Sequence, residues 1–359
     1  MRLQLAALLV PAVSLLASPL ARQAAAQELE AGEGDATSRI LIYSDDDATT
    51  VTTAAVDGQA GVQRGMVIGV HALVDAVSTA SVDVVSAATE RWDETRVELG
   101  ARASALVTGT TVSIGYIRSQ ENDWLSNAVS VSGSKELFQR NTVVSASYSL
   151  VLNKVGRAED PTFEKSLDGH SVALSISQLV DRKTRVGASY TGQYLSGFMS
   201  SPYRYVSAID GSRGPERHPD SRVRHALSGF AVRSLAPFLS ARGSYRLYLD
   251  DWGVRSHTGT VALASDFGGR WSAGVEGRVY LQNQANFYRR TYPTVLRHMT
   301  NDRELSSFWD VGGSGRLGVR VGPVDADAKV GMIHYRFRNF LALPRRTALI
   351  ASGGIKVAW

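Results

Sequence analysis

The seven histidines are the first candidates for chemistry, because imidazole is a common general base and metal ligand. None stands in H-E-x-x-H or another metal-ligand spacing. His170-Ser171 and Ser256-His257 are adjacent pairs, but strand neighbours point to opposite faces, so neither pair joins a nucleophile to its base. Without cysteine there is no thiolate or disulfide. We predict no catalytic residue, metal or cofactor. A Ser–His site built from separate strands, as in barrel phospholipases, stays open as a minor alternative.

Two further patterns could be interpreted as binding sites, but neither has the spacing that such a site requires. The three aspartates at 45–47 could bind calcium but lack the loop spacing of a known site, so we interpret them as a solvated hairpin tip. The glycine pairs at 268–269 and 353–354 do not sit between a strand and a helix. They are turn and packing glycines, not phosphate cradles.

Apolar and polar residues alternate along the segments that must position any site, with a period of two residues. In 309–321 the odd positions are apolar or glycine and the even ones are polar or glycine, and 96–107, 270–282 and 324–332 repeat the alternation. Such alternation predicts strands with one apolar face. The strands are about 10–13 residues long, whereas soluble strands usually have about 5–6 and a tilted membrane strand needs about 9–11. The pattern favours membrane-spanning strands.

The connections alternate between short and long. We expect short turns near 108–110, 181–183, 236–237, 268–269 and 322–323, and long polar loops near 76–92, 153–167, 196–221, 283–305 and 337–345. Short periplasmic turns and long outer loops are typical of outer-membrane barrels, which must close because an open edge leaves backbone groups unpaired in hydrocarbon. We predict an all-β, transmembrane antiparallel β-barrel as a single domain over 38–359.

We predict sixteen strands, with fourteen as the alternative and both termini periplasmic. The predicted strands are 38–44, 49–57, 62–75, 93–107, 111–120, 125–133, 140–152, 168–180, 184–195, 222–235, 237–249, 254–267, 270–282, 307–321, 323–336 and 346–359.

The two ends of the chain predict its destination. Residues 1–26 have a basic start, an apolar middle and a small-residue end at Ala24–Ala26, which indicates a cleaved secretory signal, followed by a short periplasmic segment, 27–37. In the last strand Ile355, Val357 and Trp359 share one face. A terminal aromatic there resembles the signal read by the outer-membrane barrel assembly machinery. We expect a bacterial outer-membrane protein with membrane lipid and that machinery as partners.

The charge is dominated by arginine, yet the net charge of +5 is too small to indicate a nucleic-acid partner. The alternation turns one set of charges into the barrel lumen. The predicted lumen charges are Arg96, Arg102, Arg242, Arg246, Arg270, Arg278, Arg316, Arg320, Glu98, Glu276, Asp325 and Asp327. An Arg-rich wall favours anions. The alternative is that arginines and acids pair across the wall and neutralise one another.

A second set of residues falls in the predicted outer loops and would converge on the extracellular mouth. These residues are Glu121, Asp123, Arg204, Glu216, Arg217, Asp250, Asp251, Trp252, Tyr288, Arg289 and Arg290. One interpretation is a charged constriction that selects solutes or docks a partner. The other is a salt-bridged loop cap that holds the mouth in shape.

Several runs resemble an uncharacterised bacterial family, domain of unknown function 3570. The DDWG segment at 250–253 and the FY pair at 287–288 are the most specific of them. The runs are 74–89, 119–126, 140–142, 201–206, 216–227, 245–258 and 278–290. The first run departs from the pattern, since Thr79 stands where members more often have glycine. The resemblance spans about 38–359 and implies an outer-membrane barrel without an established reaction.

Together these patterns favour a porin-like channel with an Arg-rich lumen and a constricted extracellular mouth. The alternative is a sheath or conduit for a periplasmic redox or lipoprotein partner, which rests on the genes that accompany the resembling family. An enzyme and a purely structural barrel are the remaining alternatives.

Overall fold

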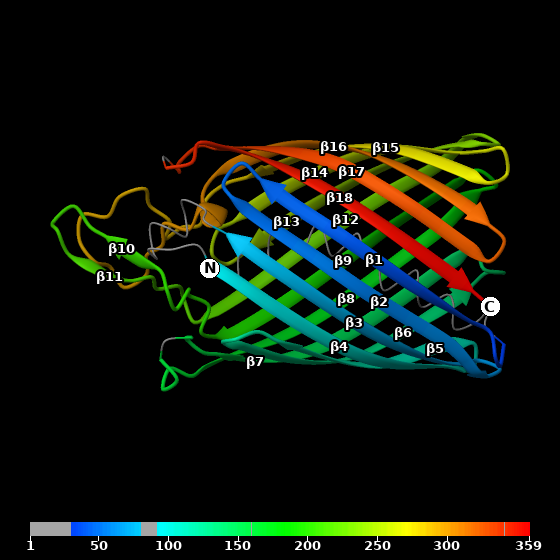
Figure 1. Cartoon of the computed structure of the whole chain (residues 1–359), viewed down its shortest axis with the longest axis horizontal. Coiled ribbons are helices and arrows are strands. Elements are labelled where there is room, and N and C mark those ends of the chain that lie inside the picture. Colours follow the sequence, from blue (N-terminus) through cyan, green and yellow to red (C-terminus); the bar gives the residue numbers. More distant parts are fainter. Residues whose placement is uncertain (1–29, 80–91, 159, 341) are drawn as a thin grey trace.

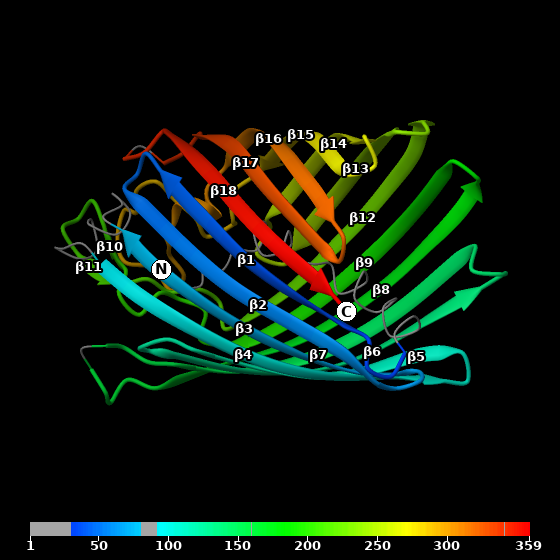
Figure 2. The ribbon, with the colours of Figure 1, turned by 45° about the vertical axis from the view of Figure 1, so that its right-hand side comes forward.

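Sixteen long strands close into one antiparallel barrel in the computed structural model, which describes residues 30–79, 92–158, 160–340 and 342–359. The strands follow one another around the wall in chain order, and β1 (Gly34–Asp45) closes the barrel by pairing with β18 (Arg345–Ala358), as Figure 2 shows. The remaining wall strands are β2 (Thr49–Gln63), β3 (Met66–Thr79), β4 (Trp92–Val107), β5 (Thr110–Gln120), β6 (Trp124–Leu137), β7 (Thr142–Val155), β8 (Lys165–Asp181), β9 (Thr184–Gly197), β12 (Ser221–Ala236), β13 (Leu239–Asp250), β14 (Arg255–Phe267), β15 (Trp271–Gln282), β16 (Phe308–Val321) and β17 (Val324–Phe337).

The prediction of sixteen strands is confirmed, and the alternative of fourteen is wrong. The wall strands run from 11 to 17 residues, so several extend beyond the predicted bounds; β1, for example, begins at Gly34 instead of residue 38. The extra residues pair in register with β2 and β18, so their backbone groups are part of the barrel ladder. The predicted signal segment 1–26 and most of the predicted 76–92 loop lie outside the described residues.

Side chains alternate between the outer face of the wall and the lumen, as the period of two predicts. In β3, Ile68 and Val70 are exposed outward, whereas Val67 and Leu73 are buried on the inner face. Apolar side chains left exposed around the outside are the expected partners of lipid acyl chains. Within the described residues, no helix is long and apolar enough to cross a membrane.

We call the barrel end that carries the C-terminus and the tight connections the turn end (Figure 1). The connection between β4 and β5 consists of Thr108 and Gly109, whose φ angles are 48° and 73°. Two positive φ values give a turn whose twist matches that of the flanking strands, and glycine supplies one of them without steric cost. Among the described residues, tight turns of this kind leave no loop to cover the lumen at this end.

The opposite end, which we call the loop end, carries the long connections. A short hairpin, β10 (Tyr205–Ser207) and β11 (Arg213–Pro215), projects beyond the wall there, beside the β15–β16 connection (Figure 1). That connection contains the one short helix, η1 (Arg303–Leu305), of the described residues. The three clusters of buried apolar side chains found in the described chain all include residues of the loop end. The packed core of this protein therefore lies at one end of the barrel.

Candidate functional site

Two long connections fold onto each other at the loop end and form what we call the cap, residues 198–220 and 283–307. The backbones of Arg217 and Met299 exchange two hydrogen bonds of 3.0 and 2.9 Å. The cap is also joined to the wall, since the Phe198 N–H donates to the Ser166 carbonyl at 2.8 Å and the Asn286 N–H to the Trp252 carbonyl at 2.8 Å. Reciprocal backbone bonds fix the relative position of segments that lie about 80 residues apart in the chain.

A buried ion-pair network lies inside the cap. Arg204 Nη1 lies 3.5 Å from Glu216 Oε1 and 3.4 Å from Asp302 Oδ1, and all three side chains are almost fully buried. Glu216 also accepts the Thr300 hydroxyl at 2.5 Å and the Ser201 N–H at 3.0 Å. Burial opposes ionisation of Glu216, but the charges of His218 and Arg204 outweigh it and hold the pKa of this carboxyl well below its usual range. Glu216 therefore stays ionised inside the cap.

A second group of ion pairs ties the cap to the first hairpin and the last strand. Arg303 of η1 contacts Asp47, and Arg346 of β18 lies 3.8 Å from Asp45 and 3.7 Å from Glu304. The interpretation of residues 45–47 as a solvated tip is wrong for Asp45 and Asp47, whose side chains are buried. Their partners come from positions some 250–300 residues further along the chain, a distance that no local pattern spans.

Apolar packing adds to the contacts of the cap. Trp252 and Tyr288, both predicted at the mouth, are buried in one cluster with Met199, Ala285 and Leu305. The Trp252 indole N–H donates to the Ser221 carbonyl at 2.9 Å, and the Tyr288 hydroxyl donates to the Asn339 carbonyl at 3.1 Å. Satisfied polar groups within an apolar cluster make this a specifically packed unit.

Of the predicted contacts between acids and arginines at the mouth, the pair of Arg204 and Glu216 forms. Asp250 contacts Arg222 of the adjacent barrel strand instead, and Asp251 accepts the Val223 N–H at 3.0 Å. Among the described residues, the exposed Arg217, Arg289 and Arg290 make no ion pair. The predicted contacts with those three arginines are wrong, because their side chains lie on the solvent side of the cap.

Glu121 and Asp123 meet a third carboxylate, Glu94. One oxygen of each lies within 4.8 Å of the others, a spacing that a divalent cation could accept. Asp123 also accepts the hydroxyl of Tyr203, which brings the cap against the β5–β6 connection. We assign no ion to this group.

In the lumen, most charges of β1–β4 and β15–β18 are paired. The pairs include Arg96 with Asp75 at 2.5 Å and Lys329 with Glu276 at 3.5 Å. Further close pairs are Arg39 and Arg316 with Asp327, Arg320 with Asp325, Arg278 with Asp310, and His71 with Asp57 and Glu98. Arg102 donates to Gln59 at 3.0 Å, and Arg270 lies in the turn before β15. We call this side of the lumen the paired arc.

On β9, β12 and β13 the lumen holds arginines of a different kind. Within the described chain, Arg185, Arg242 and Arg246 have no carboxylate partner. The guanidinium carbons of Arg185 and Arg242 lie 5.8 and 5.0 Å from the centre of the Phe230 ring, so two positive charges share one aromatic ring. We call these three residues the free arginines.

Beside the free arginines the lumen is lined with serine. Ser134, Ser145, Ser175, Ser189 and Ser228 stand directly opposite one another across β6, β7, β8, β9 and β12. The row ends at Arg246, which is the partner of Ser228 on β13. This row was not predicted from the sequence, although serine at 130, 132 and 134 and at 145, 147 and 149 was a visible signal. We call β5–β9 the serine arc.

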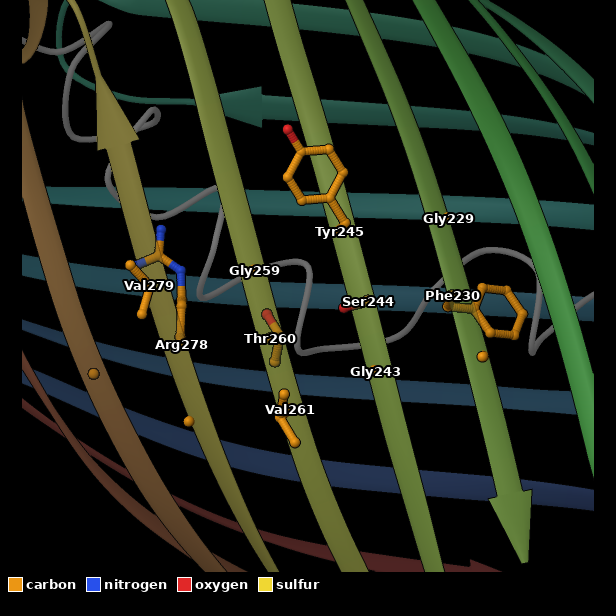
Figure 3. A pocket seen from close by; sticks show the side chains of 13 residues that line it. Gly229, Phe230, Gly243, Ser244, Tyr245, Gly259, Thr260, Val261, Arg278 and Val279 are labelled. Atoms are coloured by element: carbon orange, nitrogen blue, oxygen red, sulfur yellow. The ribbon is translucent and has the colours of Figure 1, made fainter.

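Each of β12–β16 carries glycine in the wall. A hollow of about 920 Å³ is lined there by residues that include Gly229, Gly243 and Gly259. In Figure 3 the side chain of Tyr245 stands between Gly229 and Gly259 of the two neighbouring strands, which carry no side chain there. The hollow lies in the wall, away from the cap.

The predicted assembly signal lies on the outer face. Ile355, Val357 and Trp359 are exposed at the turn end, with Trp359 hydrogen-bonded through its backbone to Gly34. An exposed terminal strand face is accessible to the assembly machinery, whose involvement stays a prediction.

Comparison with solved structures shows the same kind of barrel. A bacterial polysaccharide outer membrane secretin is 10% identical with a TM-score of 0.53, and the match covers 90% of this chain and 98% of the secretin. The siderophore receptor PirA from Pseudomonas aeruginosa is 12% identical with a TM-score of 0.46, covering 86% of this chain. This chain spans just over half the length of that receptor, 56%. At 10% identity the likeness to the secretin shows an outer-membrane-type fold alone.

No curated protein matches the chain. The sequence profile of a protein family of unknown function, DUF3570, matches residues 84–167 and 161–322, which is more than half of the chain. The predicted resemblance is thereby confirmed. The chain belongs to the DUF3570 family.

Proposed function

We propose that this protein is a solute channel of the outer membrane, closed at rest at its extracellular mouth and selective for anions. The loop end is then extracellular and the turn end periplasmic. The observation that carries the proposal is the set of free arginines Arg185, Arg242 and Arg246, which keep their charge uncompensated in the lumen. Uncompensated cations on a channel wall attract anions and repel cations.

The closed state follows from the one-sided packing. A barrel of about sixteen strands is wide enough to hold an aqueous channel unless loops fill it. Here the cap buries both an ion-pair network and an apolar cluster, whereas the turn end has only tight turns among the described residues. Opening therefore requires a part of the cap to move.

The test is single-channel recording of the refolded protein in a planar bilayer with a salt gradient. We expect rare openings in the native protein and a reversal potential that indicates anion selectivity when it opens. Open steps without selectivity, or selectivity for cations, would contradict the role of the free arginines.

A second candidate is a sheath that holds a periplasmic redox or lipoprotein partner. The lack of a packed cluster at the turn end among the described residues favours it, since a partner would enter from that side. Co-purification after cross-linking of cells tests it, and a conducting barrel with no cross-linked protein would argue against it. We propose no reaction and no cofactor for either candidate.

A further inference from the structure

Two arginines face each other on the outside of the barrel near the loop end. Arg336 of β17 and Arg345 of β18 are directly opposite in the strand register, and both side chains are exposed. Directly opposite residues of antiparallel strands have Cβ atoms only about 4.5–5.5 Å apart, and like charges in that position destabilise a sheet. The pair is therefore unfavourable unless an anion lies between or above the two guanidinium groups.

The protein itself does not supply that anion. Neither arginine makes an ion pair within the described chain. The acid of the adjoining hairpin, Asp46, instead accepts the Thr347 N–H at 2.8 Å. The lumen arginines of nearby β15 and β16, by contrast, have carboxylate partners, namely Arg278, Arg316 and Arg320. The exposed pair differs from them.

The surroundings of the pair are ordered by polarity along the outer face. Trp309 of β16 stands directly opposite Arg336 on its other side. One step further from the loop end, His334 bonds the Thr347 hydroxyl at 3.1 Å, and beyond them Met332 and Leu349 are exposed and apolar. A level with two cations and an aromatic ring, then a hydrogen-bonding level, then an apolar surface matches the order of phosphate, glycerol or sugar, and acyl chain in a lipid.

We propose that the outer face of β16–β18 binds the phosphate group of a phosphorylated outer-leaflet lipid between Arg336 and Arg345. A guanidinium group binds phosphate through two parallel charge-assisted hydrogen bonds, and a second guanidinium group adds a further positive charge and further donors. The acyl chains would lie along Met332 and Leu349. The inference is independent of what the lumen carries.

The experiment is native mass spectrometry of the full-length refolded barrel, with lipid A carrying both phosphates as the probe. The test variant is Arg336→Gln/Arg345→Gln. The matched control is Arg118→Gln/Arg255→Gln, which removes two exposed outward arginines near the loop end that stand opposite neutral residues. Mobility on gels before and after heating reports whether each variant is folded.

We expect one tightly retained lipid A on the native protein and the control, and a loss of roughly tenfold in affinity in the test variant. Fully dephosphorylated lipid A should be retained no better by the native protein than by the test variant. Equal retention by the native protein and the test variant, or an equal loss in the control, would overturn the proposal.

Two further arms use only the native protein, so the proposal stays testable if the variant fails to fold. Retention of phosphorylated and dephosphorylated lipid A to the same extent would overturn it. Displacement of the lipid by millimolar inorganic phosphate would show that the arginines hold a free anion and not a lipid, which also overturns it.

Discussion

The two ends of this barrel differ in how they are held together. At the loop end, Arg204 and Arg346 are buried with carboxylates of distant segments, and Trp252 packs in an apolar cluster. At the turn end, adjacent strands are joined by short turns such as Thr108-Gly109, and stability comes from local pairing. The contacts of the loop end can be weakened without breaking the pairing of the strands, whereas those of the turn end cannot. If the protein is the channel we propose, gating belongs to the loop end and the turn end serves the architecture of the barrel.

Removing the central cation of the cap should have the largest effect. Arg204→Ala leaves Glu216 and Asp302 buried without that cation, and breaking a buried pair costs about 3–5 kcal/mol. The sheet should survive, because the network lies beyond the strands. We expect frequent openings in single-channel records, with unchanged mobility on unheated gels. The control is Arg217→Ala, which removes an exposed arginine of the same cap and should behave as the native protein.

Charge reversal in the lumen should have the next largest effect. In the Arg204→Ala background, Arg242→Glu/Arg246→Glu replaces two uncompensated cations with anions, so selectivity should change from anions to cations. The matched control is Arg316→Glu/Arg320→Glu, which makes the same change of charge at arginines that are paired with Asp327 and Asp325. If the control shifts the reversal potential as much as the double variant, the distinction between free and paired arginines is wrong.

Acid should loosen the cap without affecting the turn end. The pKa of Glu216 is held below its usual value of 4.5, so its ionic contribution is complete well above pH 4.5. This contribution declines below pH 4.5, because Glu216 then takes up a proton in the loosened cap but not in the packed cap. It vanishes only below the lowered pKa that Glu216 has in the packed cap. We expect opening frequency to be flat from pH 8 to 5.5 and to rise below about pH 4.5. Glu216→Gln should remove that rise, and a rise that persists would assign it to another group.

The smallest effect is expected in the serine arc. Ser145→Ala/Ser175→Ala removes two uncharged hydroxyls of the row, one of which donates to Ser134 at 3.0 Å. Each lost bond is worth about 1 kcal/mol, and no charge changes. We expect unchanged selectivity and a midpoint of urea unfolding lowered slightly. A change in selectivity would show that the serine arc contributes to ion choice.

The fold was predictable from the sequence because one rule, alternation, applies to every strand. It placed Arg96, Arg242 and Arg316 on the inner face and gave the parity of the connections. The cap was only partly predictable. Trp252 and Tyr288 were placed at the mouth, but Asp47 and Arg303 pair across 256 residues, and no periodic signal encodes such a contact. The alternation along a strand likewise predicts that Arg242 faces the lumen. It does not predict whether a carboxylate lies near that arginine.

The most direct test of the account is a comparison of single-channel conductance between the native protein and Arg204→Ala, recorded in the same bilayer and salt gradient. The account predicts a mostly silent native barrel and a variant that opens frequently with anion-selective steps. A native barrel that is freely open, or a folded variant as silent as the native protein, would contradict the claim that the cap closes the channel.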